Sequence, residues 1–484
     1  MLKIINKKKL TIVQINDVHG HIEPHNEVFF EADGFETKEA GGYSRIKTLV
    51  DNIRRENPNT LFLDCGDTFH GTFITTQTKG NAILPLMNAM SIDAATAHWD
   101  FAYTPSHLRE LSNRLNYPIL SANTYIYDKK KRLFDPYIIK EIDGMKIGIV
   151  GMACEHIVQG FPPKFSQGIY MSPEYEEITK IVSELKNKEK VDFIILLSHL
   201  GMPTDYEILK TITDVDVCVS GHTHNRLNYP IKIGGALLIQ SGCHGSFITR
   251  LDLDILNGKI VDYKHQLITV DSTIEKNPEI EQIIEDIYEP YNEELNEVVG
   301  ETNTTLSREL SAESTMDNFL LNAISYVTGN KVCFSHGWRY GVPIVPGNIT
   351  VKDLYNIVPM NPKIVTVDLK GYEILELLNL KINKTYNTNP FGQTGGFMQR
   401  ALGIKAYVMI ENPKKYRIQK LFIEGEEYVA DKTYKVSYIT KQSVPKYLGE
   451  NHKQLEITAI DAMKQYLKAN SPIEIQMNDT FVII

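Results

Sequence analysis

The sequence predicts an α/β protein of two domains, in which an α/β domain is followed by a smaller α+β domain. Three observations lead to this prediction. The chain has 484 residues, more than a single hydrophobic core usually supports. Up to about residue 250, short runs rich in β-branched residues alternate with segments of helical period, the pattern of an α/β domain. Beyond Gly300 a new mixture of helices and strands begins.

Residues 1–272 form the expected first domain. Amphipathic helices are expected over Tyr43–Arg55 and Ser172–Lys188, and a further helix over Gly80–Met90. The expected strands are Leu10–Asn16, Thr60–Cys65, Lys146–Met152, Val191–Ser198, Val215–Ser220 and Ala236–Ser241.

Residues 273–300 are expected to form a connecting helix. Asn277 is a typical N-cap, and Pro278 occupies the first helical position, where its missing N–H costs nothing. We expect a kink at Pro290, because proline removes a hydrogen bond inside a helix. Apolar residues recur at helical spacing at Ile280, Ile283, Ile284, Ile287, Tyr288 and Tyr291.

Residues 301–484 form the expected second domain. It should contain a helix over Met316–Val327, a stretch punctuated by glycine and proline over His336–Gly347, and strands near Ile364–Leu369 and Tyr434–Ile439. We found no internal repeat and no low-complexity segment.

The charge and the cysteines exclude several classes of function. The net charge is -9, with 60 acidic and 51 basic residues, so the chain has no basic excess for a nucleic-acid polymer or an anionic membrane. The run Met1–Leu10 leaves no room for the apolar core of a secretory signal. Five scattered cysteines without CxxC spacing are expected to be reduced thiols in the cytoplasm. The location would be extracytoplasmic if a leader had been removed. The cysteines are Cys65, Cys154, Cys218, Cys243 and Cys333.

Asp and His residues follow nearly every expected strand of the first domain. In α/β sheets the carboxyl ends of the strands converge on one crevice, so these side chains should meet there. His98, from the loop after the Gly80–Met90 helix, can join them. The post-strand residues are Asp17, His19, Asp67, His199, His222 and His224.

These seven side chains, with one carboxylate shared, suffice to hold two divalent metal ions. Imidazole and carboxylate ligands without thiolate favour manganese, iron or zinc over calcium. Two such ions beside the carboxylates of Asp17 and Asp67 leave a surplus of positive charge. This charge lowers the pKa of a bridging water, which then becomes hydroxide, and it attracts an anionic substrate.

Each residue alone has a more ordinary interpretation. A single His after a strand is more often a surface or hydrogen-bonded residue than a ligand, and an Asp there is usually a cap or turn residue. The pairs Asp17-Val-His19 and His222-Thr-His224 favour the metal site, because each follows a strand rich in Val or Ile. The nearby His21, His25 and His70 are expected to be non-ligands or supporting residues.

At these residues the sequence resembles the calcineurin-like metallophosphoesterases, and specifically the two-domain bacterial 5′-nucleotidase family, over essentially the whole chain. The resemblance implies a four-layer α/β/β/α first domain and a separate 5′-nucleotidase-type C-terminal domain, residues 301–484, that binds substrate. It also implies that Asp17, His19, Asp67 and His224 bind one metal, and that Asp67, His98, His199 and His222 bind the other. The matching motifs are Asn16-Asp17-Val-His19-Gly20-His21, Gly66-Asp67-Thr-Phe, Ser198-His199-Leu-Gly201 and Gly221-His222-Thr-His224.

One block departs from the family. The family usually has Gly-Asn-His-Glu-Phe-Asp, in which Asn binds metal and His, oriented by the last Asp, donates a proton or stabilises the transition state. The block runs from Ala97 to Ala102 here, and His98 can replace the Asn. Trp99 cannot usefully donate a proton and Ala102 cannot orient anything. A His-Trp block of this kind resembles that of the thiosulfohydrolases of bacterial sulfur oxidation.

The second domain matches the family only in part. His336-Gly337-Trp338-Arg339 is similar to a Gly-Gly-x-Arg substrate loop, so Arg339 is the candidate for gripping an anionic group by its planar fork. An equally weighted alternative is that Arg339 simply stacks at the surface beside its aromatic neighbours. The Pro-Phe-Gly-Asn segment appears as Pro359-Met360-Asn361, which keeps Asn361 as a substrate-binding candidate but loses the Phe that stacks on a base. Nucleotide specificity is therefore open.

These observations lead to three functional hypotheses. The first is a cytoplasmic metal-dependent phosphomonoesterase acting on a nucleotide or another small phosphate ester, with a metal-bridging hydroxide as nucleophile. The second is hydrolysis of S-linked sulfonates, suggested by Trp99. The third is a catalytically weak protein that binds metal and a small anion. The oligomeric state is open in all three.

Overall fold

The computed structural model describes residues 7–127, 131–158, 161–172 and 175–484. The chain divides into two compact units. The first comprises Met1–His25 and Glu39–Glu289, and the second comprises Asn26–Lys38 and Pro290–Ile484. The expected domains, residues 1–272 and 301–484, are each one continuous stretch of the chain. The compact units are not, because the segment 26–38 belongs to the second unit.

Two sheets form the centre of the first unit. The strand orders are β13-β14-β12-β11-β9-β8 and β16-β15-β1-β4-β5. Strands β9, β11, β12 and β14 are parallel, as are β1, β4 and β5. Their bounds are β1 Lys8–Ile15, β4 Thr60–Asp64, β5 Ala94–Ala95, β8 Tyr137–Ile142, β9 Met145–Met152, β11 Phe193–Ser198, β12 Val217–Ser220, β13 Ile231–Ile233, β14 Ala236–Ile239, β15 Phe247–Leu256 and β16 Lys259–Thr269.

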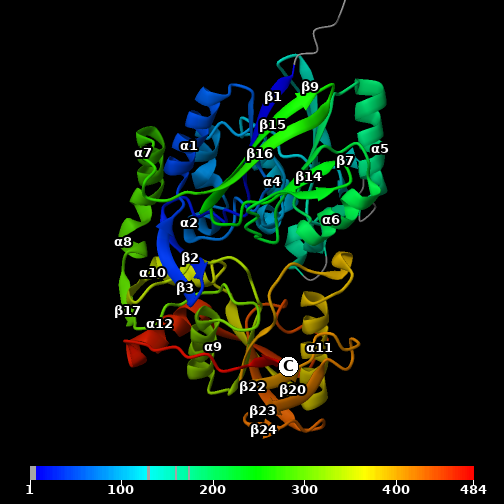
Figure 1. Cartoon of the computed structure of the whole chain (residues 1–484). Coiled ribbons are helices and arrows are strands. Elements are labelled where there is room, and N and C mark those ends of the chain that lie inside the picture. The colour runs from blue at the N-terminus through cyan, green and yellow to red at the C-terminus, as the bar shows by residue number, and fades with distance from the viewer. Residues whose placement is uncertain (1–6, 128–130, 159–160, 173–174) are drawn as a thin grey trace, which may run out of the picture. The chain divides into compact units, whose positions relative to one another are not determined.

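The two sheets pack against each other, and helices cover their outer faces (Figure 1). In β11, Phe193, Ile195 and Leu197 enter the core between the sheets. The alternate Ile194 and Leu196 enter a second core under α5 (Glu176–Glu184) and α6 (Met202–Thr211). Helix α1 (Tyr43–Glu56) contacts β4 on the other sheet. The first domain is therefore the expected four-layer α/β/β/α arrangement, and β11 is apolar throughout because both its faces are buried.

All six strands expected in the first domain are present, with ends shifted by one or two residues. Two expected helices differ. Gly80–Met90 contains a 3₁₀ turn, Asn81–Ile83, followed by α3 (Leu84–Ala89), because Pro85 begins a new helix. The helix expected over 172–188 begins at Glu176, and residues 173–174 of that range lie outside the described residues.

The long hairpin of β15 and β16 was not predicted from the sequence. Leu251, Leu253 and Ile255 are buried in alternation with more exposed residues, the pattern of a strand with one buried face. The two strands are joined by Asn257 and Gly258, both with positive φ (50° and 73°). Asn-Gly is the typical two-residue hairpin turn, so the sequence contained a clear indication. A second hairpin, β2 (His25–Glu31) and β3 (Gly34–Ala40), was also missed.

The connecting helix begins as expected and ends early. The Asn277 side chain accepts hydrogen bonds from the N–H groups of Glu279 and Ile280, which caps α7 (Pro278–Tyr288). Pro290 lies in a 3₁₀ turn, Glu289–Tyr291, before the short α8 (Asn292–Leu295). The proline therefore interrupts the helix instead of kinking it, because its missing N–H ends the ladder of hydrogen bonds.

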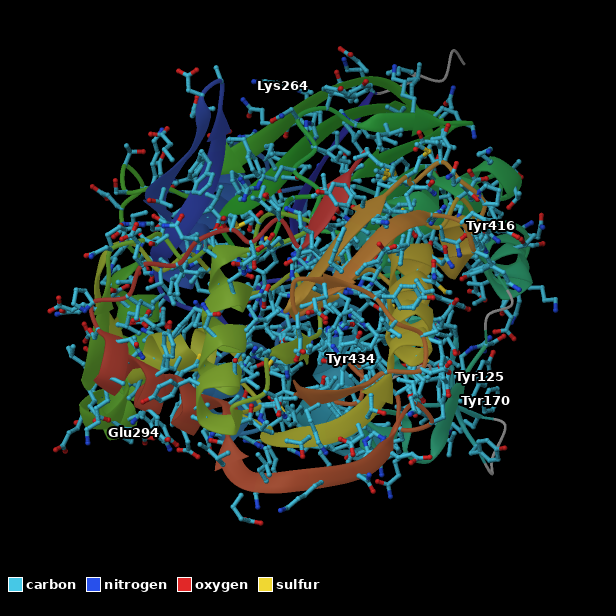
Figure 2. The ribbon with its side chains drawn as sticks, turned by 90° about the horizontal axis from the view of Figure 1, so that it is seen from below. Tyr125, Tyr170, Lys264, Glu294, Tyr416 and Tyr434 are labelled. Atoms are coloured by element: carbon cyan, nitrogen blue, oxygen red, sulfur yellow. The ribbon has the colours of Figure 1, made fainter. Side chains whose placement is uncertain are left out.

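A small sheet, β10 (Ile169–Met171), β6 (Thr124–Ile126) and β7 (Lys131–Arg132), also belongs to the first unit. The rings of Tyr125 and Tyr170 stack with centroids 5.1 Å apart and planes 12° apart, and Figure 2 shows them side by side. Arg132 lies over the Tyr125 ring at 5.3 Å. Cross-strand aromatic pairs of this kind stabilise a short sheet.

The second unit is built on the sheet β21-β18-β25-β20-β26. The expected strands and helix are present as β20 (Lys363–Lys370), β25 (Thr433–Tyr438) and α9 (Thr315–Thr328). The other elements of this sheet and its core are β18 Val332–Ser335, β21 Arg400–Leu402, β26 Glu450–Thr458 and α11 Gly371–Thr385. Within the described residues, no helix has the length and apolar character needed to cross a bilayer.

Candidate metal centre

The seven candidate ligands lie at the carboxyl ends of parallel strands of the first unit. Asp17 and His19 follow β1, Asp67 follows β4, and His98 follows β5, a two-residue strand that the sequence analysis missed. His199 follows β11, and His222 and His224 follow β12. Because strands of one direction end at the same edge of a sheet, the topology brings these loops together.

One group consists of Asp17, His19 and His224. One ligand atom from each lies within 4.8 Å of the others. The His224 Nε2 atom is 3.2 Å from Asp17 Oδ1. These are three of the four residues expected around the first ion.

A second group consists of Asp67, His98 and His199, again within 4.8 Å. Asp67 Oδ2 is 3.3 Å from both His98 Nδ1 and His199 Nε2, and 3.4 Å from His19 Nε2 of the first group. His222 lies beside this group, with its ring centroid 4.8 Å from that of His98. Asp67 thus lies within 3.4 Å of both groups, closer than Asp17, whose Oδ1 atom is 3.6 Å from His199 Nε2 of the second group. Asp67 therefore has the position expected of a bridging ligand.

Five of the seven candidate ligands have left-handed backbone conformations. The φ angles are 52° at Asp17 and His19, 61° at Asp67, 71° at His222 and 57° at His224. Non-glycine residues rarely adopt positive φ, although Asp and His do so more often than most. Such conformations cluster at functional sites, where the surrounding structure maintains them.

Asp100 connects the loops that carry Asp67 and His98. Its carboxylate accepts hydrogen bonds from four backbone N–H groups at 2.8 to 3.1 Å. It is 1% exposed, so each of these bonds forms away from water. In the sequence this residue lies within the block from Ala97 to Ala102, and no role was predicted for it. The four donors are Asp67, Thr68, Phe69 and His98.

Asn16 and Asp205 hold other parts of the site. Asn16 Nδ2 donates to Asp17 Oδ2 at 2.7 Å and to the Gly242 carbonyl at 2.6 Å. The hydroxyls of Ser198 and Ser220, which end β11 and β12, each donate to the Asp205 carboxylate at 2.6 Å. Asp205 therefore ties together the two strand ends that precede His199 and His222. Asn16 was quoted only as part of a motif, and Asp205 was missed.

Burial and the neighbouring charges shift the pKa values of the ligands in opposite directions. Burial by itself lowers the pKa of His199, but the carboxylates of Asp67 and Asp17 raise it to about 10. Burial lowers the pKa of His19 to about 3. Burial would raise the pKa of Asp67, yet His98, His199 and His19 hold it well below its ordinary value. The centre therefore presents ionised carboxylates, and cations can replace the protons that it holds.

The arrangement fits divalent metal ions. His98 is 1% exposed, and its Nε2 atom has no hydrogen-bond partner within the described part of the chain. A buried polar atom without a partner is rare and calls for an unseen ion or water. Carboxylate and imidazole donors in two adjoining groups supply such an ion with the ligands that transition metals prefer.

Trp99 forms an apolar wall next to the centre. Its ring lies 4.8 Å from Phe161 and 5.6 Å from Phe165, and Ala102 belongs to the same apolar cluster. The Trp99 backbone N–H donates to Asp67 Oδ1 at 2.5 Å. Trp99 therefore positions a ligand through its backbone while its side chain offers an apolar surface.

The two residues expected to bind substrate belong to the second unit. Arg339 is partly exposed, and its guanidinium lies 5.4 Å above the ring of Phe397. It stacks on a residue distant in sequence, whereas Arg308 lies near Trp338 and Tyr340. Asn361 Oδ1 accepts from the backbone N–H of Ile460, in the first turn of α12 (Ala459–Asn470). That side chain supports a helix end, and a substrate role for it stays a prediction.

Comparison with known families gives two matches that follow one another along the chain. Residues 10–226 match the calcineurin-like phosphoesterase family, and residues 297–441 match the 5′-nucleotidase C-terminal domain family. The chain is a calcineurin-like phosphoesterase with a 5′-nucleotidase C-terminal domain. The family implies divalent metal ions, and the seven side chains are the candidate ligands for them.

Curated relatives of this phosphoesterase share about a quarter of its residues. The trifunctional nucleotide phosphoesterase protein YfkN of Bacillus subtilis is 24% identical over 88% of this chain, but the chain spans only 31% of that protein's length. A 5′-nucleotidase of Vibrio cholerae is also 24% identical, over 96% of this chain and 91% of the relative.

Two solved structures share the fold over nearly the whole chain. The sulfate thiohydrolase SoxB of Thermus thermophilus has a TM-score of 0.91 and 20% identity, covering 98% of this chain and 96% of its own. A 5′-nucleotidase precursor from Thermus thermophilus has a TM-score of 0.87 and 23% identity, covering 99% of both chains. The fold alone therefore does not separate phosphate from sulfonate chemistry.

Proposed function

We propose that this phosphoesterase is a metal-dependent phosphomonoesterase that acts on a nucleotide or another small phosphate ester. The observation that carries the proposal is the convergence of seven Asp and His side chains: two groups of three lie side by side, Asp67 of the second group contacts His19 of the first, and His222 lies beside the second group. The nucleotide phosphoesterase and 5′-nucleotidase relatives support this substrate class.

We assign two divalent ions, manganese, zinc or iron, to the two groups. Asp17, His19 and His224 would hold one, and His98, His199 and His222 the other, with Asp67 shared. When bound, such ions polarise the phosphoryl oxygens and supply a nucleophile from water at neutral pH.

The surrounding residues determine how precisely the ligands are placed. Asp100 fixes the loops of Asp67 and His98 through four backbone hydrogen bonds, and Asn16 orients the Asp17 carboxylate. Second-layer hydrogen bonds of this kind fix the direction of each ligand. Arg339 is our candidate for gripping an anionic part of the substrate, because its planar fork matches a phosphate or carboxylate.

The leaving group receives no help from the residue at position 99. The indole N–H of Trp99 is too weak an acid to protonate a departing alkoxide usefully. Burial lowers the pKa of the neighbouring His70 to about 4, so that imidazole is neutral at pH 7 and is a poor general acid. We therefore propose that esters with good leaving groups are the better substrates.

Hydrolysis of S-linked sulfonates is the second candidate. The His98-Trp99 block and the fold likeness to the sulfate thiohydrolase favour it. A thiolate is a good leaving group, which suits a site without a proton donor. A panel of nucleotides, sugar phosphates, p-nitrophenyl phosphate and S-sulfonates, assayed with each metal, tests both candidates. Metal-dependent release of phosphate supports the first, and release of sulfate supports the second. Without metal-dependent turnover on any of them, the protein would be a metal-binding and anion-binding protein instead.

A further inference from the structure

Cys154 lies two residues beyond β9, at the same sheet edge as the candidate ligands. Its side chain is 1% exposed and forms no disulfide. Its backbone N–H donates to the carbonyl of Ala97 at 3.3 Å, which holds it beside the loop of His98. The sequence analysis treated this residue as one of five scattered thiols without a role.

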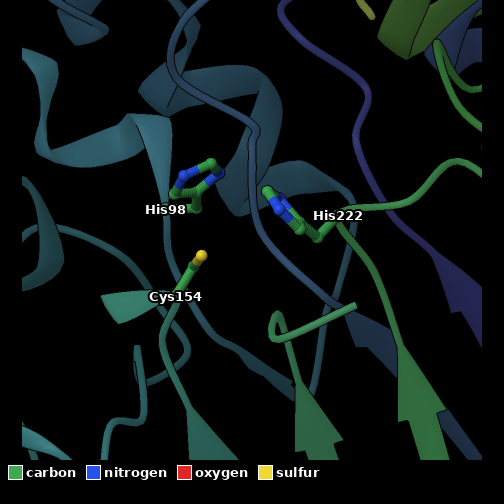
Figure 3. A group of neighbouring side chains, drawn as sticks. All are labelled: His98, Cys154 and His222. Atoms are coloured by element: carbon green, nitrogen blue, oxygen red, sulfur yellow. The ribbon is translucent and has the colours of Figure 1, made fainter. Parts of the chain in front are cut away.

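The Cys154 sulfur and one ring nitrogen each of His98 and His222 lie within 4.8 Å of one another. Figure 3 shows the sulfur pointing toward the space between the two rings. All three residues are buried, at 1% exposure for His98 and 8% for His222. His98 Nε2, which has no hydrogen-bond partner among the described residues, is a second indication that something binds here.

We propose that Cys154 is a sulfur ligand of the divalent ion on the His98 and His222 side of the centre. This inference rests on the proposed metal-dependent function and adds a donor that was not among the ligands expected from the sequence. On binding, the S–H bond breaks, a sulfur–metal bond forms and the proton passes to solvent.

A sulfur donor changes which metal the centre prefers. Thiolate and imidazole together select zinc and similar soft ions, whereas carboxylates alone suit manganese or magnesium. The Cys154 side of the centre should therefore prefer zinc to manganese. The side formed by Asp17, His19 and His224 has nitrogen and oxygen donors only.

Cys218 provides a matched control. It is a buried, free thiol within β12, the parallel strand that carries His222, and it packs in the apolar core under α5 and α6. It belongs to none of the donor groups within the described residues. A change at Cys218 tests the effect of losing a buried sulfur without touching the centre.

X-ray absorption of the zinc-loaded wild-type protein tests the proposal directly. We expect a zinc–sulfur shell at about 2.3 Å beside the nitrogen and oxygen shell at about 2.0–2.1 Å. The sulfur shell should disappear in Cys154→Ala and persist in Cys218→Ala. A wild-type spectrum with nitrogen and oxygen shells only would overturn the proposal, even if Cys154→Ala does not fold.

Metal content separates this inference from the proposed function. If the wild-type protein binds two ions and hydrolyses phosphate esters but shows no sulfur shell, Cys154 is no ligand and the proposed function stands. If it binds no divalent ion tightly, both proposals fail. Competition between zinc and manganese gives a second readout. Cys154→Ala should lose the preference for zinc over manganese at one of the two metal positions, and Cys218→Ala should keep it.

Discussion

The imidazole of His70 stacks on the indole of Trp99, with ring centroids 4.8 Å apart and planes 22° apart. This stack occupies the side of the centre where the family's block has a histidine. Both rings present flat faces to each other, and His70 is fully buried. The Trp99 side chain therefore contributes packing at this side of the centre.

Trp99→His should restore selective help for poor leaving groups. A positioned general acid contributes about 10²–10⁴-fold, so we expect alkyl phosphates to gain far more than p-nitrophenyl phosphate. Adding Ala102→Asp would bury a carboxylate in an apolar cluster, so the single change is the cleaner test. The measurement is kcat on both ester types, with Trp99→Phe as control. If kcat rose equally on both esters, or on neither, the side chain at position 99 would serve only in packing.

Asp67→Ala should abolish tight binding of two ions. Asp67 Oδ2 lies within 3.4 Å of nitrogen atoms from both groups, so its loss affects both ions. Elemental analysis of the purified variant provides the measurement. Asp254→Ala, which changes a carboxylate paired with Lys7 far along the sheet, should keep wild-type metal content. Two tightly bound ions in Asp67→Ala would refute the bridging role.

Asp100→Ala should weaken metal binding without removing a ligand. Four backbone N–H groups lose their acceptor, which frees the loops of Asp67 and His98. Loss of such supporting bonds typically costs about 10–100-fold in metal affinity, measurable by competition with a chelator. Asp93→Ala is the matched control, because Asp93 precedes β5 at its other end and accepts from the Phe62 N–H. Unchanged affinity in Asp100→Ala would show that the loops need no such support.

Arg339→Ala should raise KM on the best substrate. A hydrogen bond to a charged group contributes about 1.5–3 kcal/mol, so the increase should be roughly 10–100-fold. The KM of Arg339→Lys should lie between those of the wild type and Arg339→Ala, because lysine keeps the positive charge and lacks the planar guanidinium fork. If KM and kcat stay at wild-type values in both variants, Arg339 only stacks on Phe397.

Asp205→Asn should change how stability depends on pH. Burial raises the pKa of Asp205 from 3.8 to about 7. Between these values the folded protein holds a proton that the unfolded chain has released, so this group makes the free energy of unfolding fall as pH rises. The contribution is at most about 1.4 kcal/mol per pH unit. Urea unfolding of metal-free protein across this window should show a less negative slope in Asp205→Asn than in wild type. Identical slopes in both would contradict the prediction, and Asp254→Asn serves as control.

The strands and the ligand positions could be predicted because local patterns encode them. A run such as 193–198 is apolar throughout since both its faces are buried, and an Asp or His directly after it reaches the common sheet edge. The roles of Asp100 and Asp205 depend on which backbone amides and hydroxyls come near them in three dimensions. No spacing in the sequence encodes those partners.

Cys154 illustrates the same limit. Its distance from His222 in the sequence says nothing about the sheet order that places β9 beside β11 and β11 beside β12. The missed β15–β16 hairpin is different, because Asn257-Gly258 and the alternation around Leu253 were visible in the sequence. This hairpin could therefore have been predicted from the sequence.

The positive φ angles at Asp17, His19, Asp67, His222 and His224 have a consequence for protein engineering. A left-handed residue with a side chain is strained by roughly 1–2 kcal/mol, and glycine relieves that strain. Selection of variants for heat resistance alone would therefore favour glycine at the same positions that are expected to bind metal. Thermostable variants of this chain should be screened for bound metal as well as for melting temperature, because a glycine that relieves backbone strain at these positions also removes a candidate ligand.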